Sequence, residues 1–270
     1  MRQAVVLGMF LAVVLVSPGP SAAPPQPIAA LAPVEVWAAG FANLVGIAVD
    51  DEGAVFVSDH HARKLVRIAP TGQRSIVASA LDRPAGLALD PQGRVVVAEQ
   101  HGNRVVRLEK NGQRTTLVTG VRRPRWVAVA EDGAGYISAP RLTRHAEPDV
   151  EDVDDAEPQM ILVWRDGQFR VFADGLRAVQ GLAVADDALY VATRGRRHEP
   201  IARGIIYRVP ILAAGVPGVP TAFGPGDRAE RPTGLALDRL GALWIATPEL
   251  HAGGTTTKDS IAKLHLDGTA

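Results

Sequence analysis

Short hydrophobic runs separated by glycine-containing turns dominate the pattern of this chain. Five of these runs are versions of one phrase, and they lie at GIAVD from Gly46, GLALD from Gly86, WVAVA from Trp126, GLAVA from Gly181 and GLALD from Gly234. The first two intervals are 40 residues each, and the next two are 55 and 53 residues. A repeat of this length that holds strands rather than helices is typical of a β-propeller. We therefore predict an all-β fold in which each repeat of about 40 residues forms one four-stranded blade.

The second repeat shows what such a blade should contain. Its apolar segments predict strands at Gly86–Asp90, Arg94–Glu99, Arg104–Leu108 and Arg114–Thr119. Glycines in the turns between them supply positive φ angles without a Cβ clash. Because the strands are apolar on both faces, we expect each blade to be buried between two neighbours.

The two ends of the repeat region predict how the blades close. Trp37 lies nine residues before Gly46, as Leu117 lies nine residues before Trp126, so Val34–Ala39 has the position of a fourth strand without its own blade. The last repeat stops at Ala270 without a fourth strand. A five-bladed propeller in which the N-terminal strand completes the last blade fits both ends. A six-bladed propeller truncated at its C-terminus fits them equally well.

The first 33 residues predict export rather than a folded element. Residues 1–23 have the layout of a signal peptide: a positive start at Arg2, an apolar run over Ala4–Val16, and small residues up to Ala23. The apolar run is too short for a permanent membrane span. Residues 24–33 then predict a Pro/Ala linker, and residues 34–270 a single propeller domain. We therefore expect a periplasmic or secreted protein without stable membrane insertion after cleavage.

Charge and cysteine content narrow the partners and the sources of stability. The 29 basic and 29 acidic residues cancel, which gives no electrostatic reason to expect nucleic acid as a partner. The chain has no cysteine, so an exported form must be held together by sheet packing rather than by disulfides.

Loop lengths indicate which face of the propeller carries function. Long connections are predicted at Pro140–Gln159, Arg194–Arg203 and Pro248–Asp259, all on one face. Residues immediately before the repeated phrase should point into that mouth: Val45, Ala85, Arg125, Gln180 and Thr233. The predicted ligand-binding residues at this face are Arg125, Trp126, Gln180, Thr233, Arg141 and Arg194.

Acidic and imidazole side chains recur at equivalent positions of the first two repeats. Asp59 and Glu99 end the second strands, and His61 and His101 follow two positions later. If the four side chains converge, they predict a site for a divalent metal such as Ca, Mn, Zn or Mg, with His101 and Glu99 as candidate catalytic groups. Two alternatives remain open: the carboxylates cap turns or pair with Arg63 or Arg104, and the histidines are solvated loop residues.

The segment RPAGLALDPQGRVVVAEQHGNRVVRLEKNGQ (Arg83–Gln113) resembles an NHL repeat. It is also similar to the repeats of the SMP-30/gluconolactonase group and of streptogramin lyases. For SMP-30-type lactonases the resemblance implies a divalent metal in the channel, held by residues immediately before the repeated phrase. Here those positions carry Val45, Ala85, Arg125, Gln180 and Thr233, and none is a carboxylate. The metal site implied by the resemblance is therefore not expected in this chain.

Two functions remain compatible with this pattern. The first is a binding module that holds a small polar molecule or a protein segment on its loop-rich face. The alternative is an enzyme at the same face, either a metal-dependent sugar lactonase or lyase, or a quinone-linked sugar dehydrogenase, which the phrase GIIYRVP (Gly204–Pro210) resembles. In the enzyme, Glu99 or Asp59 with His101 would act as metal ligands or base, and Arg125 would hold an anionic group.

Overall fold

The computed structural model describes residues 38–140, 158–185, 187–194, 204–223, 229–230, 232, 234–237, 242–252 and 255–265. All of them belong to one compact unit, Ala38–Ala270. In this part of the chain nearly every element is a strand, and the helical content is one short 3-10 turn at Ala213–Gly215. None of the described helical segments is long and apolar enough to cross a membrane. The all-β prediction is confirmed.

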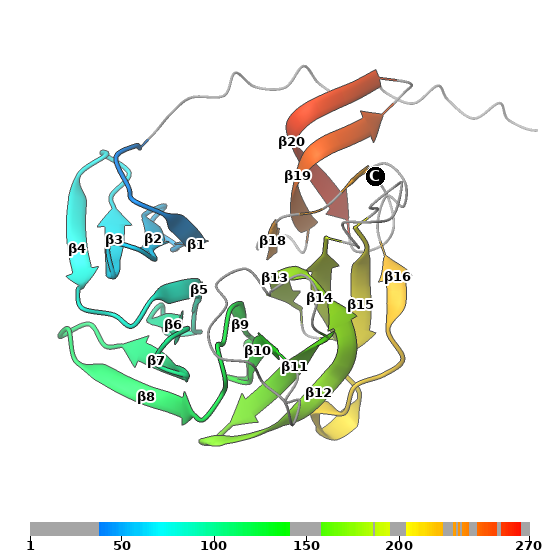
Figure 1. Ribbon diagram of the computed structural model, residues 1–270, viewed down its shortest axis with the longest axis horizontal. Coiled ribbons are helices and arrows are strands. Elements are labelled where there is room, and N and C mark those ends of the chain that lie inside the picture. The colour runs from blue at the N-terminus through cyan, green and yellow to red at the C-terminus, as the bar shows by residue number, and fades with distance from the viewer. Residues whose placement is uncertain are drawn as a thin grey trace, which may run out of the picture. The chain divides into compact units, whose positions relative to one another are not determined.

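Four consecutive antiparallel sheets form the regular part of the fold (Figure 1). The first holds β1 (Leu44–Val49), β2 (Val55–Asp59), β3 (Lys64–Ile68) and β4 (Arg74–Ala78). The second holds β5 (Pro84–Leu89), β6 (Val95–Glu99), β7 (Arg104–Leu108) and β8 (Arg114–Thr119). The third holds β9 (Val127–Val129), β10 (Gly135–Pro140), β11 (Pro158–Arg165) and β12 (Gln168–Arg177). The fourth holds β13 (Val179–Val184), β14 (Ala188–Thr193), β15 (Ile206–Pro210) and β16 (Thr221–Phe223).

Each of these sheets is a blade whose strands pair in chain order. The strands predicted for the second repeat match β5 to β8 to within two residues at their ends. Gly93 (φ +70°) and Gly112 (φ +81°) occupy the turns between strands, in the left-handed region that glycine tolerates best. The alternation of apolar runs and glycine turns therefore predicted the blade correctly.

The fifth sheet differs from the other four. It contains β17 (Ala229–Glu230), β18 (Gly234–Leu237), β19 (Ala242–Ala252) and β20 (Thr255–His265), in the order β17-β19-β18 with β20 paired to β19. The loop predicted at Pro248–Asp259 is therefore wrong, because most of that segment forms the two arms of the β19–β20 hairpin, with Ala252 opposite Thr255. The β-branched run Thr255–Thr257 favours such a strand.

The number of blades predicted from the sequence is not confirmed. The structure shows four blades of four strands in chain order and a fifth sheet of a different order. Of the predicted closing strand Val34–Ala39, only Ala38 and Ala39 are described, and they form no strand. The other two long connections expected on the loop-rich face lie mostly outside the described residues, over 141–157 and 195–203.

The hydrophobic core lies between neighbouring blades rather than inside any one of them. Phe56 and Leu65 of the first blade pack with Leu87 and Val97 of the second. The next boundaries repeat this arrangement with their own apolar clusters, and the last one joins Tyr190 to strand β19. Val97 is completely buried. Because each blade covers the apolar face of its neighbour, the strands can be apolar on both faces, as the sequence pattern requires.

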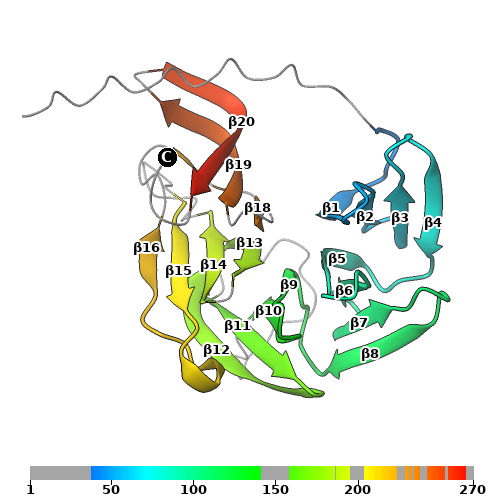
Figure 2. The same cartoon turned by 180° about the vertical axis from the view of Figure 1, so that it is seen from behind.

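The first strands of the blades contact one another in succession and lie on the inner side of the fold (Figures 1 and 2). Glycine allows this close approach, since a Cβ on Gly46 would lie 2.6 Å from the carbonyl oxygen of Ala85. A Cβ on Gly86 would lie 2.6 Å from the carbonyl oxygen of Arg125, which accepts the Gly86 N–H. The repeated glycine is therefore a packing requirement, and it fixes the residues beside it at the inner edge of the blades.

Candidate ligand-binding site

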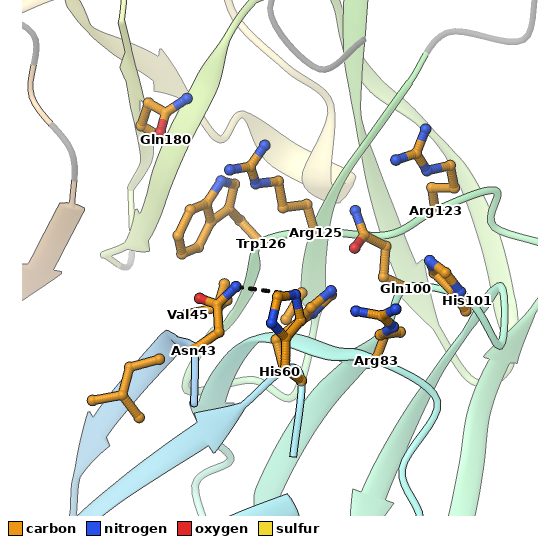
Figure 3. A pocket seen from close by; sticks show the side chains of 13 residues that line it. Asn43, Val45, His60, Arg83, Gln100, His101, Arg123, Arg125, Trp126 and Gln180 are labelled. Carbon is orange, nitrogen blue, oxygen red and sulfur yellow. Dashed lines mark hydrogen bonds between the residues drawn. The ribbon is translucent and has the colours of Figure 1, made fainter. Parts of the chain in front are cut away.

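A cavity of about 440 Å³ lies at the ends of the inner strands of the first four blades (Figure 3). Cationic or ionisable nitrogen groups make up much of its lining: Arg83, Arg123, Arg125, His60, His61 and His101. Its other polar side chains are the amides of Asn43, Gln100 and Gln180. Among the described residues that line it, none is acidic. Its volume is within the range of small-molecule sites.

Four of the five residues predicted to point into the mouth line this cavity. Val45, Ala85, Arg125 and Gln180 each precede the repeated phrase, and all four are part of the lining. They come together because the first strands of neighbouring blades are in contact, and each of these residues lies at or just before the start of its strand. The predicted residues Thr233 and Arg141 lie outside the described residues. Arg194 follows β14 and is not part of the described lining; its backbone N–H donates to the carbonyl oxygen of Ala178.

Arg125 and Trp126 form the centre of the lining. The guanidinium carbon of Arg125 lies 5.6 Å from the centre of the Trp126 ring, which restricts both side chains. The Trp126 backbone N–H donates to Ser138 Oγ (3.0 Å), and its indole Nε1–H donates to the carbonyl oxygen of Val179 in the next blade (2.9 Å). Trp126 therefore replaces the repeated glycine with a side chain that links the third blade to the fourth and presents its ring to the cavity.

Three histidines gather on one wall. The ring centres of His60 and His61 are 5.5 Å apart, and those of His60 and His101 are 6.5 Å apart. His60 Nδ1 lies 3.1 Å from the carbonyl oxygen of Pro84. Burial lowers the pKa of His60 below its ordinary value of 6.5, and the charges of Arg83, His61 and His101 lower the pKa further. His60 is therefore neutral at a lower pH than an exposed histidine is.

Asp59, a predicted metal ligand, is used to fix the backbone. Its carboxylate accepts the N–H groups of Ala42 (2.8 Å), Asn43 (3.0 Å) and Ala62 (3.1 Å). Burial acts to raise the pKa of Asp59, but these hydrogen bonds outweigh it, and the net pKa is lowered. Asp59 thus holds the turn that carries His60 and His61, which is the alternative role that the sequence left open.

Glu99, the equivalent residue of the second blade, is completely buried. One carboxylate oxygen accepts the Asp82 N–H (2.9 Å), and the other accepts the Nε–H of Arg104. A carboxylate in this position supports the segments that carry Arg83 and His101. The structure therefore places Glu99 in a structural pair with Arg104.

The four predicted metal ligands do not combine into a metal centre. In the described part of the chain, no group of three or more His, Cys, Asp or Glu side chains is arranged to hold a metal ion. The carboxylate oxygens of Asp59 and Glu99 accept hydrogen bonds from backbone N–H groups, and Glu99 also accepts one from Arg104. His61 and His101, by contrast, line the cavity. These residues do not fit a divalent metal.

Sequence reasoning named some of the lining and missed the rest. His60, Arg83 and Gln100 were not among the candidates. His60 directly follows β2, Gln100 directly follows β6, and Arg83 directly precedes β5. His60 and Gln100 occupy equivalent positions in two neighbouring repeats, so a comparison of the repeats could have placed them on the same side of the cavity. Gln100 and Gln180 are 8% and 7% exposed, which makes them the most buried polar groups of the lining.

The sequence matches one protein family over most of its length. Residues 47–259 match the family described as the SMP-30/gluconolactonase/LRE-like region. The chain belongs to this family. Among curated proteins, none matches the sequence.

Solved structures of similar fold agree with that membership. A gluconolactonase from Xanthomonas campestris has a TM-score of 0.61 at 21% identity, with 83% of this chain and 73% of that one covered. A calcium-binding regucalcin from Agrobacterium tumefaciens has a TM-score of 0.58 at 16% identity, with 85% and 72% covered. A chain of a nidogen/laminin complex has a TM-score of 0.58 at 16% identity, with 83% and 80% covered. At these identities the likeness shows the shared propeller fold.

Proposed function

We propose that this member of the SMP-30/gluconolactonase family is an exported binding protein that holds a small polar ligand in the cavity on its loop-rich face. The observation that carries the proposal is the cavity itself, which is lined by nine polar or charged side chains on a framework of packed strands. Binding residues placed on loops above a rigid scaffold are a common arrangement for such sites. A concave site of this volume suits a small molecule better than an extended protein segment.

The lining is preorganised, which supports binding. Gln100 and Gln180 are held in place by burial, Arg125 by its contact with the Trp126 ring, and the His60 ring by the Pro84 carbonyl group. Side chains already held in one orientation lose little conformational freedom when a ligand enters. The Trp126 ring offers an apolar surface against which the carbon skeleton of a ligand can pack.

A lactonase-type enzyme is the second candidate, and family membership favours it. Similarity to the Xanthomonas gluconolactonase extends over most of this chain. In that case His101 would be the candidate base at the cavity, and Arg125 would bind an anionic group of the substrate or product. Glu99 is already committed to Arg104 and to the Asp82 N–H, which weakens its candidacy as a metal ligand or base.

A thermal-shift screen with and without chelator separates the two candidates. The purified protein is mixed with a panel of sugars, sugar lactones, amino acids and organic acids, before and after treatment with EDTA. The binding function predicts at least one stabilising compound whose effect is unchanged by EDTA. Hydrolysis of a sugar lactone that stops on EDTA treatment and returns with Mn²⁺, Zn²⁺ or Ca²⁺ would contradict it and establish the enzyme.

Export and blade number complete the proposal. We infer cleavage after the signal peptide of residues 1–23, and a five-bladed propeller whose last blade is completed by Val34–Ala39. The exposure of β1 supports closure. Ile47 in β1 is 67% exposed, whereas the equivalent Leu87 is 6% exposed because it packs against the first blade. A last blade packed against β1 would cover Ile47 in the same way. Intact-mass measurement on protein recovered from the periplasm or medium tests the cleavage, and an unprocessed N-terminus in the cell pellet would contradict it.

A further inference from the structure

His60 directly follows β2 and is the least exposed of the three histidines that line the cavity. Its backbone N–H donates to the carbonyl oxygen of Asn43 (2.8 Å), and the Asp59 carboxylate holds the turn that follows. Its ring contacts the rings of His61 and His101. Backbone and ring contacts therefore restrict the orientation of the His60 side chain.

The contact between His60 and Pro84 decides which ring nitrogen carries the proton. Nδ1 of His60 lies 3.1 Å from the Pro84 carbonyl oxygen, which can only accept a hydrogen bond, so Nδ1 is the protonated nitrogen. A neutral imidazole has one N–H group, and Nε2 is therefore an unprotonated acceptor. Burial is the largest factor that lowers the pKa of His60, and it favours this neutral form.

Nε2 of His60 has no hydrogen-bond partner among the residues that the structure describes. It is not sealed inside the protein either, because Nη1 of Arg122 is the one described side-chain nitrogen or oxygen that is both buried and unpaired. His60 lines the cavity, so its acceptor can be reached from there. His61 and His101 are exposed, and Nε2 of His61 lies 3.5 Å from Nδ2 of Asn43. His60 is therefore the histidine of this lining whose acceptor has a fixed position.

We propose that Nε2 of His60 accepts a hydrogen bond from the ligand of this cavity, and that the ligand presents a hydroxyl or N–H donor at that point. This inference rests on the proposed binding function and specifies the chemistry of its ligand. A carboxylate or an ether oxygen offers only lone pairs to Nε2, so a compound with acceptors alone loses this contact.

The other described side chains of the lining do not select for a donor in this way. Arginine side chains only donate, and the amides of Gln100 and Gln180 can either donate or accept. Figure 3 shows His60 and Trp126 bordering the same space from different blades, so the Trp126 ring can pack against the apolar part of a ligand that donates to His60. The inferred ligand is thus an alcohol, phenol or amide with an apolar portion.

Two measurements on the wild type and on His60→Asn test the inference. Long-range ¹H–¹⁵N NMR identifies the protonated ring nitrogen of each histidine, and the His60 signals are those missing from His60→Asn. Titrations at pH 8 then compare phenol, which has a hydroxyl donor, with anisole, which has a methoxy group in its place. Asparagine is the informative replacement, because its Nδ2 is bonded to Cγ as Nδ1 of histidine is. It can still donate to the Pro84 carbonyl oxygen, whereas the acceptor Nε2 is removed.

We expect the His60 proton on Nδ1, and we expect phenol to bind the wild type about three-fold or more tightly than anisole, as one neutral hydrogen bond allows. Anisole is the more apolar probe, so apolar contact cannot produce this preference. The preference should disappear in His60→Asn and persist in Lys110→Gln, a control at an exposed residue outside the described lining.

A proton on Nε2 of His60 would overturn the inference. Equal behaviour of the two probes in the wild type would overturn it too, whether both bind or neither does, and so would a preference for phenol that survives in His60→Asn. If a compound of the thermal-shift panel stabilises the protein in any of these cases, the binding function stands and the role of His60 fails. A panel in which no compound stabilises the protein would instead contradict the binding function.

Discussion

At the scale of single residues, protonation of His60 makes the stability of the folded protein depend on pH. Burial and the charges of Arg83, His61 and His101 lower its pKa below 6.5, so the folded state binds this proton less readily than the unfolded chain does. The contribution of His60 to stability is therefore fully present above pH 6.5 and is lost as the pH falls from 6.5 toward the lowered pKa. We predict that the unfolding free energy of His60→Gln falls less than that of the wild type as the pH is lowered through this range. Urea unfolding between pH 5 and pH 8 measures the difference.

Glutamine is a suitable replacement because its amide can still donate to the Pro84 carbonyl oxygen. Parallel stability profiles for the wild type and His60→Gln would show that His60 does not carry the effect.

At the scale of elements, the repeated glycines set the distance between blades. A Cβ on Gly86 would lie 2.6 Å from the carbonyl oxygen of Arg125 and 2.9 Å from the Trp126 Cα, so the third blade would have to move. We predict that Gly86→Ala costs about 1–3 kcal/mol of unfolding free energy. It should also weaken ligand binding, because the displaced backbone carries Arg125 and Trp126. Urea unfolding and calorimetry on the same variant measure both effects.

Gly112→Ala is the control for this variant. Gly112 lies in the turn between β7 and β8 at a φ of +81°, with no atom within 4 Å of an added Cβ. Its substitution should cost about 1–2 kcal/mol through backbone conformation alone and should leave ligand affinity unchanged. An affinity loss of equal size in both variants would contradict the link between blade spacing and the cavity.

The elements also show how far the sequence could predict this structure. Strands β5 to β8 were predicted because apolar runs and glycine turns are local signals that each blade repeats. The β19–β20 hairpin was missed, although Gly253-Gly254 is a two-residue hairpin signal between β-branched and apolar segments. The length of the segment suggested a loop, but pairing of Ala242–Ala252 with Thr255–His265 decides its conformation.

The candidate site was predictable where repeat equivalence alone determines position. Val45, Ala85, Arg125 and Gln180 share one place in their repeats and do line one cavity. The direction of Asp59 and Glu99 was not predictable, because it depends on N–H groups supplied by Ala42, Asn43 and Asp82, all from other strands or loops. Long-range partners therefore turned two suspected metal ligands into structural residues.

At the scale of the whole molecule, the innermost strand of the first blade exposes apolar side chains. Leu44, Ile47 and Val49 of β1 are 48%, 67% and 58% exposed, which is unusual for a strand that is innermost in its blade. Closure through Val34–Ala39 would bring the last blade against this face. For a chain that begins at residue 24, we predict that deletion of residues 24–39 lowers Tm by at least about 4 °C.

Deletion of residues 24–33 alone is the control, since it removes only the predicted linker and should leave Tm unchanged. Differential scanning calorimetry measures both deletions against the chain that begins at residue 24. If the longer deletion has the same Tm as its control, Val34–Ala39 takes no part in closing the propeller.

The central claim is that the cavity binds a small polar ligand and does so without a divalent metal. Diffraction tests it most directly, from one crystal soaked in the compound that stabilises the protein most in the thermal-shift screen and from another soaked in Mn²⁺, whose ions are located by their anomalous signal. We predict the compound in contact with Arg125, Trp126 or Gln180, and no manganese peak within the cavity. A manganese peak held by His61 or His101, or a compound bound only outside the cavity, would contradict the claim.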